Sequence, residues 1–312
     1  MPSMTVATSD HSALDALQFH LKARNGEYCV ARTGVTLVLY FGKSTRDLAP
    51  SVSKLVALYL AAIPEDSIRS ILSTTGVWRD FTKAGLASRL RKLAAEDVDF
   101  VSIDLSSGEP GNVGEYGFHF FGTDLSNFEV WPREACSCVF EFPLAMLNAD
   151  QRGRFEQFIA TAADVEPFES GYAGYAFKHL FMTWRDEAHE WIAQKAQRFI
   201  GVDISYDSFN EAARRRVVNV SWITLLGHPL IKELGGDEQI RSQLSPEIRL
   251  QSLASGIAII AGDVPPIGDV NRGAQDLQLL KEVAALTRPV RISMEIGFGS
   301  ESFRRNWLSR LD

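Results

Sequence analysis

A run of twelve residues, GDVPPIGDVNRG at 262–273, gathers residue types that bind phosphate groups or metal ions. Glycine-rich loops cradle phosphates with backbone N–H groups, and aspartates supply oxygen ligands to cations. The spacing of these residues fits neither use. The run lacks the G-x-G-x-x-G order of a dinucleotide-binding turn, and Pro265 and Pro266 interrupt the aspartate spacing of a calcium-binding loop.

The position of this run, directly before a helical pattern at 274–287, favours a structural role. Asp and Asn side chains accept hydrogen bonds from the free N–H groups at the start of a helix. We therefore expect Asp269 or Asn271 to cap that helix, and Arg272 to pair with a neighbouring carboxylate. The alternative is an enzyme or a small-ligand-binding protein whose site is built on these three side chains, with Trp222 beside them.

The other residues able to do chemistry form no recognised motif. G-x-S-x-G and the P-loop are absent, and His189-Glu190 lacks the second histidine of H-E-x-x-H. The histidines are scattered, at His11, His20, His119, His179, His189 and His228. We interpret Cys29, Cys136 and Cys138 as reduced core or strand residues. We expect no catalytic residue, no metal site and no cofactor, although a triad assembled from distant residues stays open.

Charge is distributed unevenly along the chain. The net charge is -7, yet residues 96–150 alone carry -10, from eleven acidic side chains against Arg133. Residues 1–95 carry +5 and residues 151–312 carry -2. An acidic segment repels nucleic acids and anionic lipids, and it attracts a basic surface. The plainer interpretation of such a segment is the solvated outer face of a sheet.

The composition, with 46% hydrophobic and 23% charged residues, is that of a protein able to bury one large core or two modest ones. No apolar run approaches the roughly 18–20 residues that a membrane span needs. The N-terminal sequence MPSMTVATSDHSALDAL also lacks the basic leader and apolar stretch of a signal peptide. We therefore expect a cytoplasmic protein with no membrane contact.

Hydrophobic spacing predicts an alternation of helices and strands. Helices are expected at 11–24, 51–63, 83–95, 150–163, 182–199, 229–234, 237–244 and 274–287. Strands are expected at 27–32, 34–42, 67–78, 99–106, 116–122, 136–143, 169–177, 217–227, 251–262 and 290–299. In YGFHFFG, alternation places Tyr116, Phe118 and Phe120 on one face of a strand and His119 with Phe121 on the other.

This order of elements indicates an α+β fold with mixed or antiparallel sheets packed against helices. A strand–strand–helix theme near both ends allows two similar lobes. The expected division is an N-terminal lobe at 1–150, which carries the acidic segment, and a C-terminal lobe at 151–312. One integrated domain is the alternative.

Two stretches, VVNVSWITLLGHPLIKELGG (217–236) and IAGDVPPIGDVNRGAQDLQLLKEVAALTRPVR (260–291), carry a resemblance to a known family. They resemble the type VI secretion immunity proteins that are paired with VRR-type nuclease effectors. The residues that carry the resemblance are Trp222, Gly227, Pro229, Gly235, Gly236, Gly268, Asp269, Asn271, Arg272 and Gly273. His228 departs from the pattern, which has proline or a small residue there, and the N-terminal third matches only in the order of its elements.

The resemblance implies a cytoplasmic protein without catalytic activity, which binds a DNA-cleaving effector toxin and blocks it. Because a nuclease presents Lys and Arg to phosphates, the acidic segment is the expected contact surface. The candidate contact residues are Glu109, Glu115, Asp124, Glu129 and Glu134. We expect no nucleic acid and no membrane among the partners. A third hypothesis is a scaffold that associates as a homo-oligomer through aromatic patches such as YGFHFF.

Overall fold

A strand of 16 residues, β2 (Gly26–Phe41), runs through the middle of one antiparallel sheet. The computed structural model describes residues 12–24, 26–95, 100–126, 133–180, 185–204, 210, 212–292 and 299–312. The other strands are β1 (Gln18–Ala23), β3 (Ser70–Leu72), β4 (Trp78–Asp80), β5 (Phe100–Ser106), β6 (Gly117–Thr123), β7 (Cys136–Phe142), β8 (Ser170–His179), β9 (Ile223–Gly227), β10 (Ile248–Leu253) and β11 (Gly256–Ala261). Their order across the sheet is β10-β11-β9-β8-β2-β7-β6-β5-β3-β4, and β1 pairs with β2 as well.

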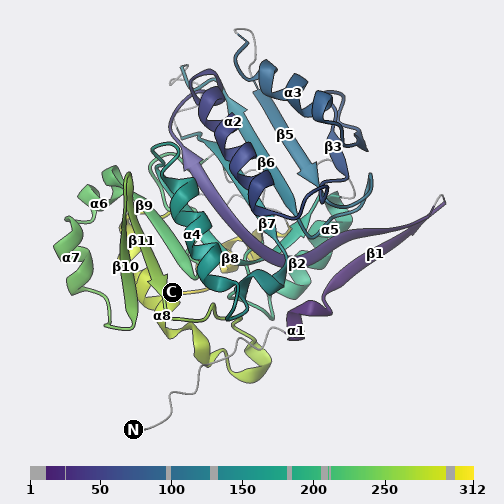
Figure 1. Cartoon of the computed structure of the whole chain (residues 1–312). Helices are drawn as coiled ribbons and strands as arrows, with labels where there is room; N and C mark the ends of the chain where they lie inside the picture. The colour runs from purple at the N-terminus through teal and green to yellow at the C-terminus, as the bar shows by residue number, and fades with distance from the viewer. Residues whose placement is uncertain are drawn as a thin grey trace.

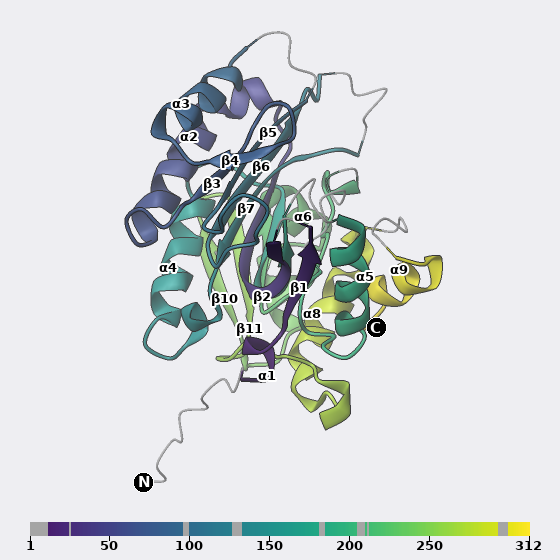
Figure 2. The same cartoon turned by 90° about the vertical axis from the view of Figure 1, so that its right-hand side faces the viewer.

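Helices cover both faces of this sheet. They are α1 (Ser12–Asp15), α2 (Thr45–Ala62), α3 (Lys83–Lys92), α4 (Arg152–Ala163), α5 (Arg185–Ala196), α6 (His228–Glu233), α7 (Asp237–Ser242), α8 (Gln278–Thr287) and α9 (Glu301–Leu308). Figures 1 and 2 show α2, α3 and α4 on one face, with α5, α8 and α9 on the other. The α+β class with an antiparallel sheet, expected from the sequence, is confirmed. None of the described helices is both long and apolar enough to cross a membrane.

The core between the sheet and helices α2 and α4 is aromatic. Tyr59 of α2 lies 5.4 Å from the Phe142 ring and 5.9 Å from the Phe140 ring, centroid to centroid. Phe158 of α4 packs edge-on against the same two rings. Such tilted pairs stabilise a core beyond the area that they bury. Phe118 is also fully buried here, so the face expected for the YGFHFF run is confirmed.

The prediction of a hairpin at 27–42 is wrong, because Thr33 and Gly34 do not form a turn. Both residues lie inside β2, where they pair with Phe177 and Ala176 of β8. The residues that follow them, VTLVLYF, are buried and mostly β-branched or aromatic, which favours one continuous strand. Gly34 has a packing role instead, because a Cβ atom there would lie 2.5 Å from Cε of Lys178.

The helix expected at 11–24 is also wrong beyond its first turn. Only Ser12–Asp15 is helical, and Gln18–Ala23 is a strand paired with the N-terminal part of β2. The two strands form a ribbon that projects from the sheet (Figure 1). Its base is braced by Phe19, which stacks on Trp191 of α5 with centroids 5.9 Å apart. Pairing with β2 therefore overrides the helical leucine spacing.

Other differences concern element boundaries. Strand 67–78 is the hairpin β3–β4, strand 251–262 is the hairpin β10–β11, and strand 217–227 shortens to β9. Helix α2 begins at Thr45, six residues earlier than expected, and tolerates Pro50 within it. The strand expected at 290–299 lies largely outside the described residues.

Candidate functional site: an acidic loop over a buried charged network

The acidic segment at 96–150 divides into surface and interior residues. Asp104, Glu134 and Glu141 are buried, with exposed fractions of 3%, 8% and 4%. The exposed acids among the described residues of this segment are Glu109, Glu115, Asp124 and Asp150. Glu129 lies outside the described residues, as do Glu96, Asp97 and Asp99. The net charge of the segment therefore overstates the charge that it presents to a partner.

The structure does not bring the candidate contact residues that it describes, Glu109, Glu115, Asp124 and Glu134, into one patch. Glu115 precedes β6 and Asp124 follows it, so the length of a seven-residue strand separates them, about 20 Å. Asp124 is engaged locally: it accepts hydrogen bonds from the Ser126 N–H and the Ser44 hydroxyl. The hydrogen bond from Ser126 holds the pKa of Asp124 below its usual range. Glu134 is largely covered and offers a partner little surface.

The loop at 107–116, between β5 and β6, carries the two remaining candidates, Glu109 and Glu115. Its backbone is held by side chains beneath it. The Ser106 hydroxyl accepts hydrogen bonds from Gly108 N–H at 3.1 Å and Gly114 N–H at 3.2 Å. These bonds fold the loop on itself and leave Glu109 exposed.

The same loop is tied to the projecting ribbon. Asn112 Oδ1 accepts a hydrogen bond from Cys29 N–H at 2.9 Å, and Val113 N–H donates to the Cys29 carbonyl at 2.9 Å. Arg32 of β2 lies 3.0 Å from a Glu115 carboxylate oxygen. Gly111, with φ of +90°, passes so close to Tyr28 that a Cβ atom would lie 3.1 Å from its ring. The loop and the base of the ribbon therefore form one packed unit.

Lys178 of β8 supports this loop from within the protein. Its side chain is fully buried, and Nζ donates hydrogen bonds to the carbonyl oxygens of Gly114 at 3.1 Å and Glu115 at 2.6 Å. Burial lowers the pKa of Lys178 to about 8, although the nearby charge of Glu141 acts in the opposite direction. A buried ammonium group thus contacts the loop through its backbone and leaves the Glu115 carboxylate outside.

His119 joins two carboxylates in the same region. Nδ1 lies 3.2 Å from Asp104 Oδ1, and Nε2 lies 3.6 Å from Glu141 Oε2. Burial alone would lower the pKa of His119, but Glu141 and Asp104 outweigh it and raise the pKa to about 10. For Glu141, burial is likewise outweighed by Lys178 and His119, which hold its pKa below the usual range. Gly117 leaves room for this pair, since its Cβ would lie 2.3 Å from Glu141 Oε2.

This arrangement does not suit acid–base catalysis. A general base at neutral pH needs a free ring nitrogen and a pKa near 7. Both nitrogens of His119 face carboxylates, and a pKa of about 10 keeps the ring protonated. The network Asp104–His119–Glu141, with Lys178 beside it, instead fixes the strands under the loop. Sequence reasoning identified His119 as a residue of a sheet face and missed its partners.

The run GDVPPIGDVNRG has a different construction. Asp269 is 6% exposed, and Arg198 donates to its two oxygens at 3.0 Å and 2.9 Å. Oδ1 also accepts from Asn271 N–H at 3.0 Å, which caps a short 3-10 helix, Val270–Arg272. Arg272 lies 3.9 Å from the same carboxylate. The expected cap is present, but it serves this 3-10 turn, since α8 begins only at Gln278.

The other motif residues shape turns and close contacts. The indole N–H of Trp222 donates to the Gly262 carbonyl at 2.9 Å, which joins β9 to the run. Gly235 and Gly236 have φ of +92° and +91° after α6, and Gly268 and Gly273 have φ of +65° and +81°. At Gly227 a Cβ atom would lie 2.3 Å from the Phe168 carbonyl, and Pro229 lies in the first turn of α6. These contacts account for the motif without a ligand.

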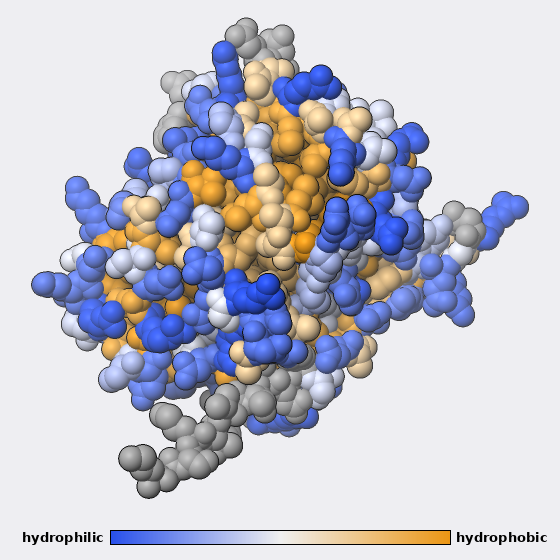
Figure 3. All heavy atoms as spheres, in the orientation of Figure 1, coloured by the Kyte–Doolittle hydropathy of each residue, from blue (hydrophilic) through white to orange (hydrophobic). Residues whose placement is uncertain are grey.

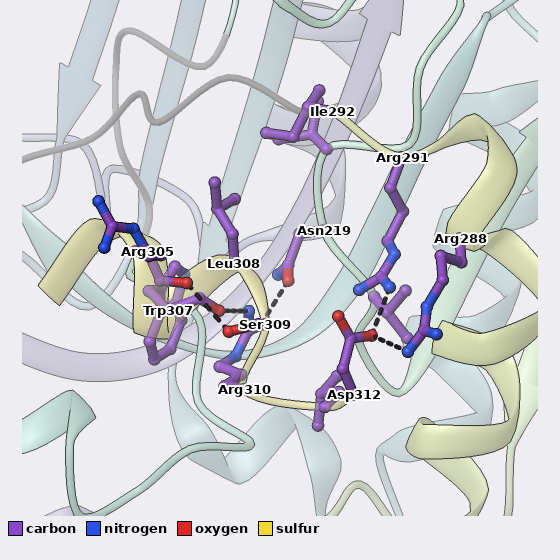
Figure 4. Close-up of a pocket in the computed structure, with 13 residues that line it drawn as sticks. Asn219, Arg288, Arg291, Ile292, Arg305, Trp307, Leu308, Ser309, Arg310 and Asp312 are labelled. Atoms are coloured by element: carbon purple, nitrogen blue, oxygen red, sulfur yellow. Dashed lines mark hydrogen bonds and ion pairs between the residues drawn. The ribbon is translucent and has the colours of Figure 1, made fainter. Parts of the chain in front are cut away.

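A pocket of about 290 Å³ lies beside the C-terminal helix α9. Several charged residues that line it form ion pairs with one another. In Figure 4, Arg288 and Arg291 both point to the Asp312 carboxylate. The half-buried Arg310 donates to Asn219 Oδ1 and to the carbonyl oxygens of Ile200 and Trp307. Burial lowers the pKa of Arg310 to about 10. We interpret these ion pairs and hydrogen bonds as structural contacts that hold α9 in place.

A wider hollow, of about 760 Å³, lies between the C-terminal end of α2 and α4. Its apolar lining includes Leu58, Ile63, Tyr116, Met146 and Phe158, and its one charged lining residue among those described is Arg154. Figure 3 shows apolar atoms gathered in the middle of the face that carries these helices. The lining offers no acid–base pair.

Comparisons with known proteins give two findings. A family model described as "Type VI immunity for VRR-NUC", TsiV, matches residues 51–306. Among solved structures, the Pseudomonas aeruginosa T6SS protein PA0821 is similar, with a TM-score of 0.78 and 21% sequence identity. The alignment covers 95% of this chain and 88% of that chain, and at this identity it shows a shared fold. A search of curated proteins found no match.

Proposed function

The chain belongs to the TsiV family of type VI immunity proteins for VRR-NUC effectors, and on this premise we propose that its loop at 107–116 contacts the cognate effector. In this proposal the protein covers the DNA-binding surface of the effector and acts without catalysis. The observation that supports the contact most directly is the loop itself: its backbone is fixed by buried groups, while Glu109 and Glu115 are exposed.

Charge supplies the physical reason for this contact. A nuclease binds phosphates with Lys and Arg side chains, so its substrate surface is basic. Acidic side chains held in place can pair with those cations and accelerate encounter between the two proteins. A fixed loop also binds with less loss of conformational entropy than a mobile one. The proposal accounts for the exposed acids at Glu109 and Glu115, whereas Asp124 would lie at the edge of the contact or beyond it.

The proposal also concerns catalytic activity and cellular location. His119 and Asp269 are of types that can take part in catalysis, and both are engaged in internal ion pairs. This supports a role as an inhibitor. A toxin that cleaves DNA acts where the DNA is, so we propose that the antidote acts in the cytoplasm. We retain the homo-oligomer as a prediction; Phe118 and Phe120 of the YGFHFF run are buried, so its surface would involve the partly accessible residues of the run, such as Phe121.

The test is a double charge reversal, Glu109→Lys with Glu115→Lys. We expect the affinity for the inactivated cognate effector to fall by about tenfold or more, mainly through slower association, because surface charges steer encounter. In cells, the variant should fail to protect against the active effector. The control is Glu238→Lys with Glu247→Lys, which makes the same change in net charge at exposed positions in α7 and just before β10.

The two variants separate local from global charge effects. If the Glu238/Glu247 control weakens binding as much as the loop variant does, net charge alone drives association and the loop is not the contact. Unchanged affinity of a folded loop variant would overturn the proposed contact but would leave membership of the family intact.

A further inference from the structure

We propose that Lys178 is a positioning residue for effector binding, because its buried ammonium group holds the loop at 107–116 in the conformation that presents Glu109 and Glu115. This inference rests on the proposed function. Lys178 does not reach the effector in this account. It acts through the backbone of the loop.

The contacts of Lys178 suit this role. Nζ of Lys178 donates hydrogen bonds to two consecutive carbonyls, those of Gly114 and Glu115, at 3.1 Å and 2.6 Å. A charged donor makes stronger hydrogen bonds than a neutral one. One of these carbonyls belongs to Glu115 itself. The hydrogen bond therefore fixes the backbone from which the Glu115 side chain projects.

The surrounding strands leave room for this long side chain. A Cβ atom at Gly34 would lie 2.5 Å from Lys178 Cε, 2.9 Å from Cδ and 2.8 Å from the Phe142 carbonyl. Glycine at this position therefore opens a path across β2 from β8 to the loop. Without that path, Lys178 could not pass under Glu115.

The charge of Lys178 is compensated within the protein. Glu141 of β7 lies close enough to influence its ionisation, and His119 in turn pairs with Glu141. Each of these groups is on a strand of the central sheet, whereas the carbonyls that Lys178 holds belong to the loop. The network therefore connects the rigid sheet to the contact loop through one side chain.

The first test is Lys178→Met, which keeps an unbranched apolar chain of similar length and removes the ammonium group. We expect faster hydrogen–deuterium exchange of amides in 107–116, with the amides of β8, β9 and β11 unchanged. Affinity for the inactivated cognate effector should fall by about tenfold, since a loosened loop must be ordered on binding. The dependence of the association rate on salt should persist, because Glu109 and Glu115 keep their charges.

A second variant distinguishes a local effect on the loop from a general loss of stability. Lys178→Met leaves Glu141 with less buried positive charge, so Lys178→Met with Glu141→Gln removes both charges together. The double variant should show the same local exchange in 107–116. A matched control is Ile259→Val in β11, a mild core substitution remote from the loop, which should lower stability and leave both the loop and the affinity unchanged.

The outcomes distinguish this inference from the proposed function. Unchanged exchange in 107–116, or faster exchange across the whole sheet in proportion to lost stability, would overturn the role of Lys178 whatever the affinity does. Faster exchange in the loop with full affinity would also overturn it. If the charge reversal at Glu109 and Glu115 has no effect on affinity, the proposed contact itself fails, even where Lys178 is shown to hold the loop.

Discussion

The loops at 107–116 and 262–273 are both rich in glycine and both carry acidic residues, yet they direct their carboxylates in opposite ways. In the first, a buried cation, Lys178, binds two backbone carbonyls. In the second, a cation, Arg198, binds the Asp269 carboxylate itself. The first loop therefore keeps its acids available at the surface, and the second uses its acid to close a turn.

This difference shows why the composition of a loop does not decide its role. What decides it is the position of the nearest cation relative to the backbone. Glu115 does have Arg32 at 3.0 Å, but its side chain remains 54% exposed, so the pair is solvated and weak. Asp269 has no such freedom, since its side chain is 7% exposed. Substitutions in each loop should therefore have different effects on stability and on binding.

The largest expected effect on stability concerns the network under the 107–116 loop. His119→Ala would leave Asp104 and Glu141 buried with less positive charge between them. We expect the free energy of unfolding to fall by about 3 kcal/mol, as for other buried ion pairs that lose one partner. Denaturant unfolding at neutral pH would measure this. A loss below about 1 kcal/mol would mean that the two carboxylates are stabilised without the imidazolium.

In the second loop, Asp269→Ala should be a substitution that affects stability alone. It removes two hydrogen bonds from Arg198 and the cap at Asn271 N–H, and we expect a loss of about 2 kcal/mol. Affinity for the effector should not change. Asp269→Asn is the informative companion, since it keeps a capping oxygen without the charge. If either variant weakens binding while remaining folded, the ligand-site alternative built on Asp269, Asn271 and Arg272 regains support.

The network under the 107–116 loop should make the stability of the protein depend on pH. His119 has a pKa of about 10 in the folded protein against 6.5 for an unperturbed histidine, so its contribution to stability is complete below pH 6.5 and is lost as the pH rises towards 10. Lys178, with its pKa lowered to about 8 from 10.5, acts in the opposite direction above pH 8. Stability should thus fall by about 1–2 kcal/mol between pH 6.5 and 8.

Thermal or denaturant unfolding of the wild-type protein and of His119→Gln at these two pH values would isolate this contribution. The variant should show a much smaller change over the interval. Equal changes in both proteins would assign the pH dependence to other groups.

The smallest expected effect on stability is that of Glu115→Ala. Its ion pair with Arg32 is exposed, so its removal should cost no more than about 0.5 kcal/mol. Binding to the effector should nevertheless weaken measurably. Glu115→Ala should weaken binding and leave stability nearly unchanged, whereas Asp269→Ala should lower stability and leave binding unchanged. If both variants change stability and binding in the same way, the proposed difference between the two loops is wrong.

Much of the fold could be predicted from local patterns. The alternation in YGFHFFG and the largely apolar run CSCVFEF indicate β6 and β7, and the glycine pair after α6 indicates its end. The two largest failures, at 11–24 and at Thr33-Gly34, come from strand pairing that local spacing does not show. Gly34 suggests a turn until Lys178 is known to lie beside it, and the leucines at 14, 17 and 21 suggest one helix until residues 18–23 are known to pair with β2.

The candidate site was less predictable. Glu109 and Glu115 could be selected from charge alone, but so were Asp124 and Glu134, which the fold places at the other end of β6 or buries. The signal for the network was one lysine in the buried strand β8, SGYAGYAFKH, and nothing local links Lys178 to a loop more than sixty residues away. The division at residue 150 stays a prediction, and the pairing of β2 with β8 favours one integrated domain.

The most direct test of the proposed contact is a hydrogen–deuterium exchange comparison of the protein alone and in complex with its inactivated VRR-NUC effector. We predict strong protection of the amides in 107–116 on binding, with no change in 262–273. Protection of 262–273 without protection of 107–116 would contradict the account and would place the effector on the loop that we interpret as structural.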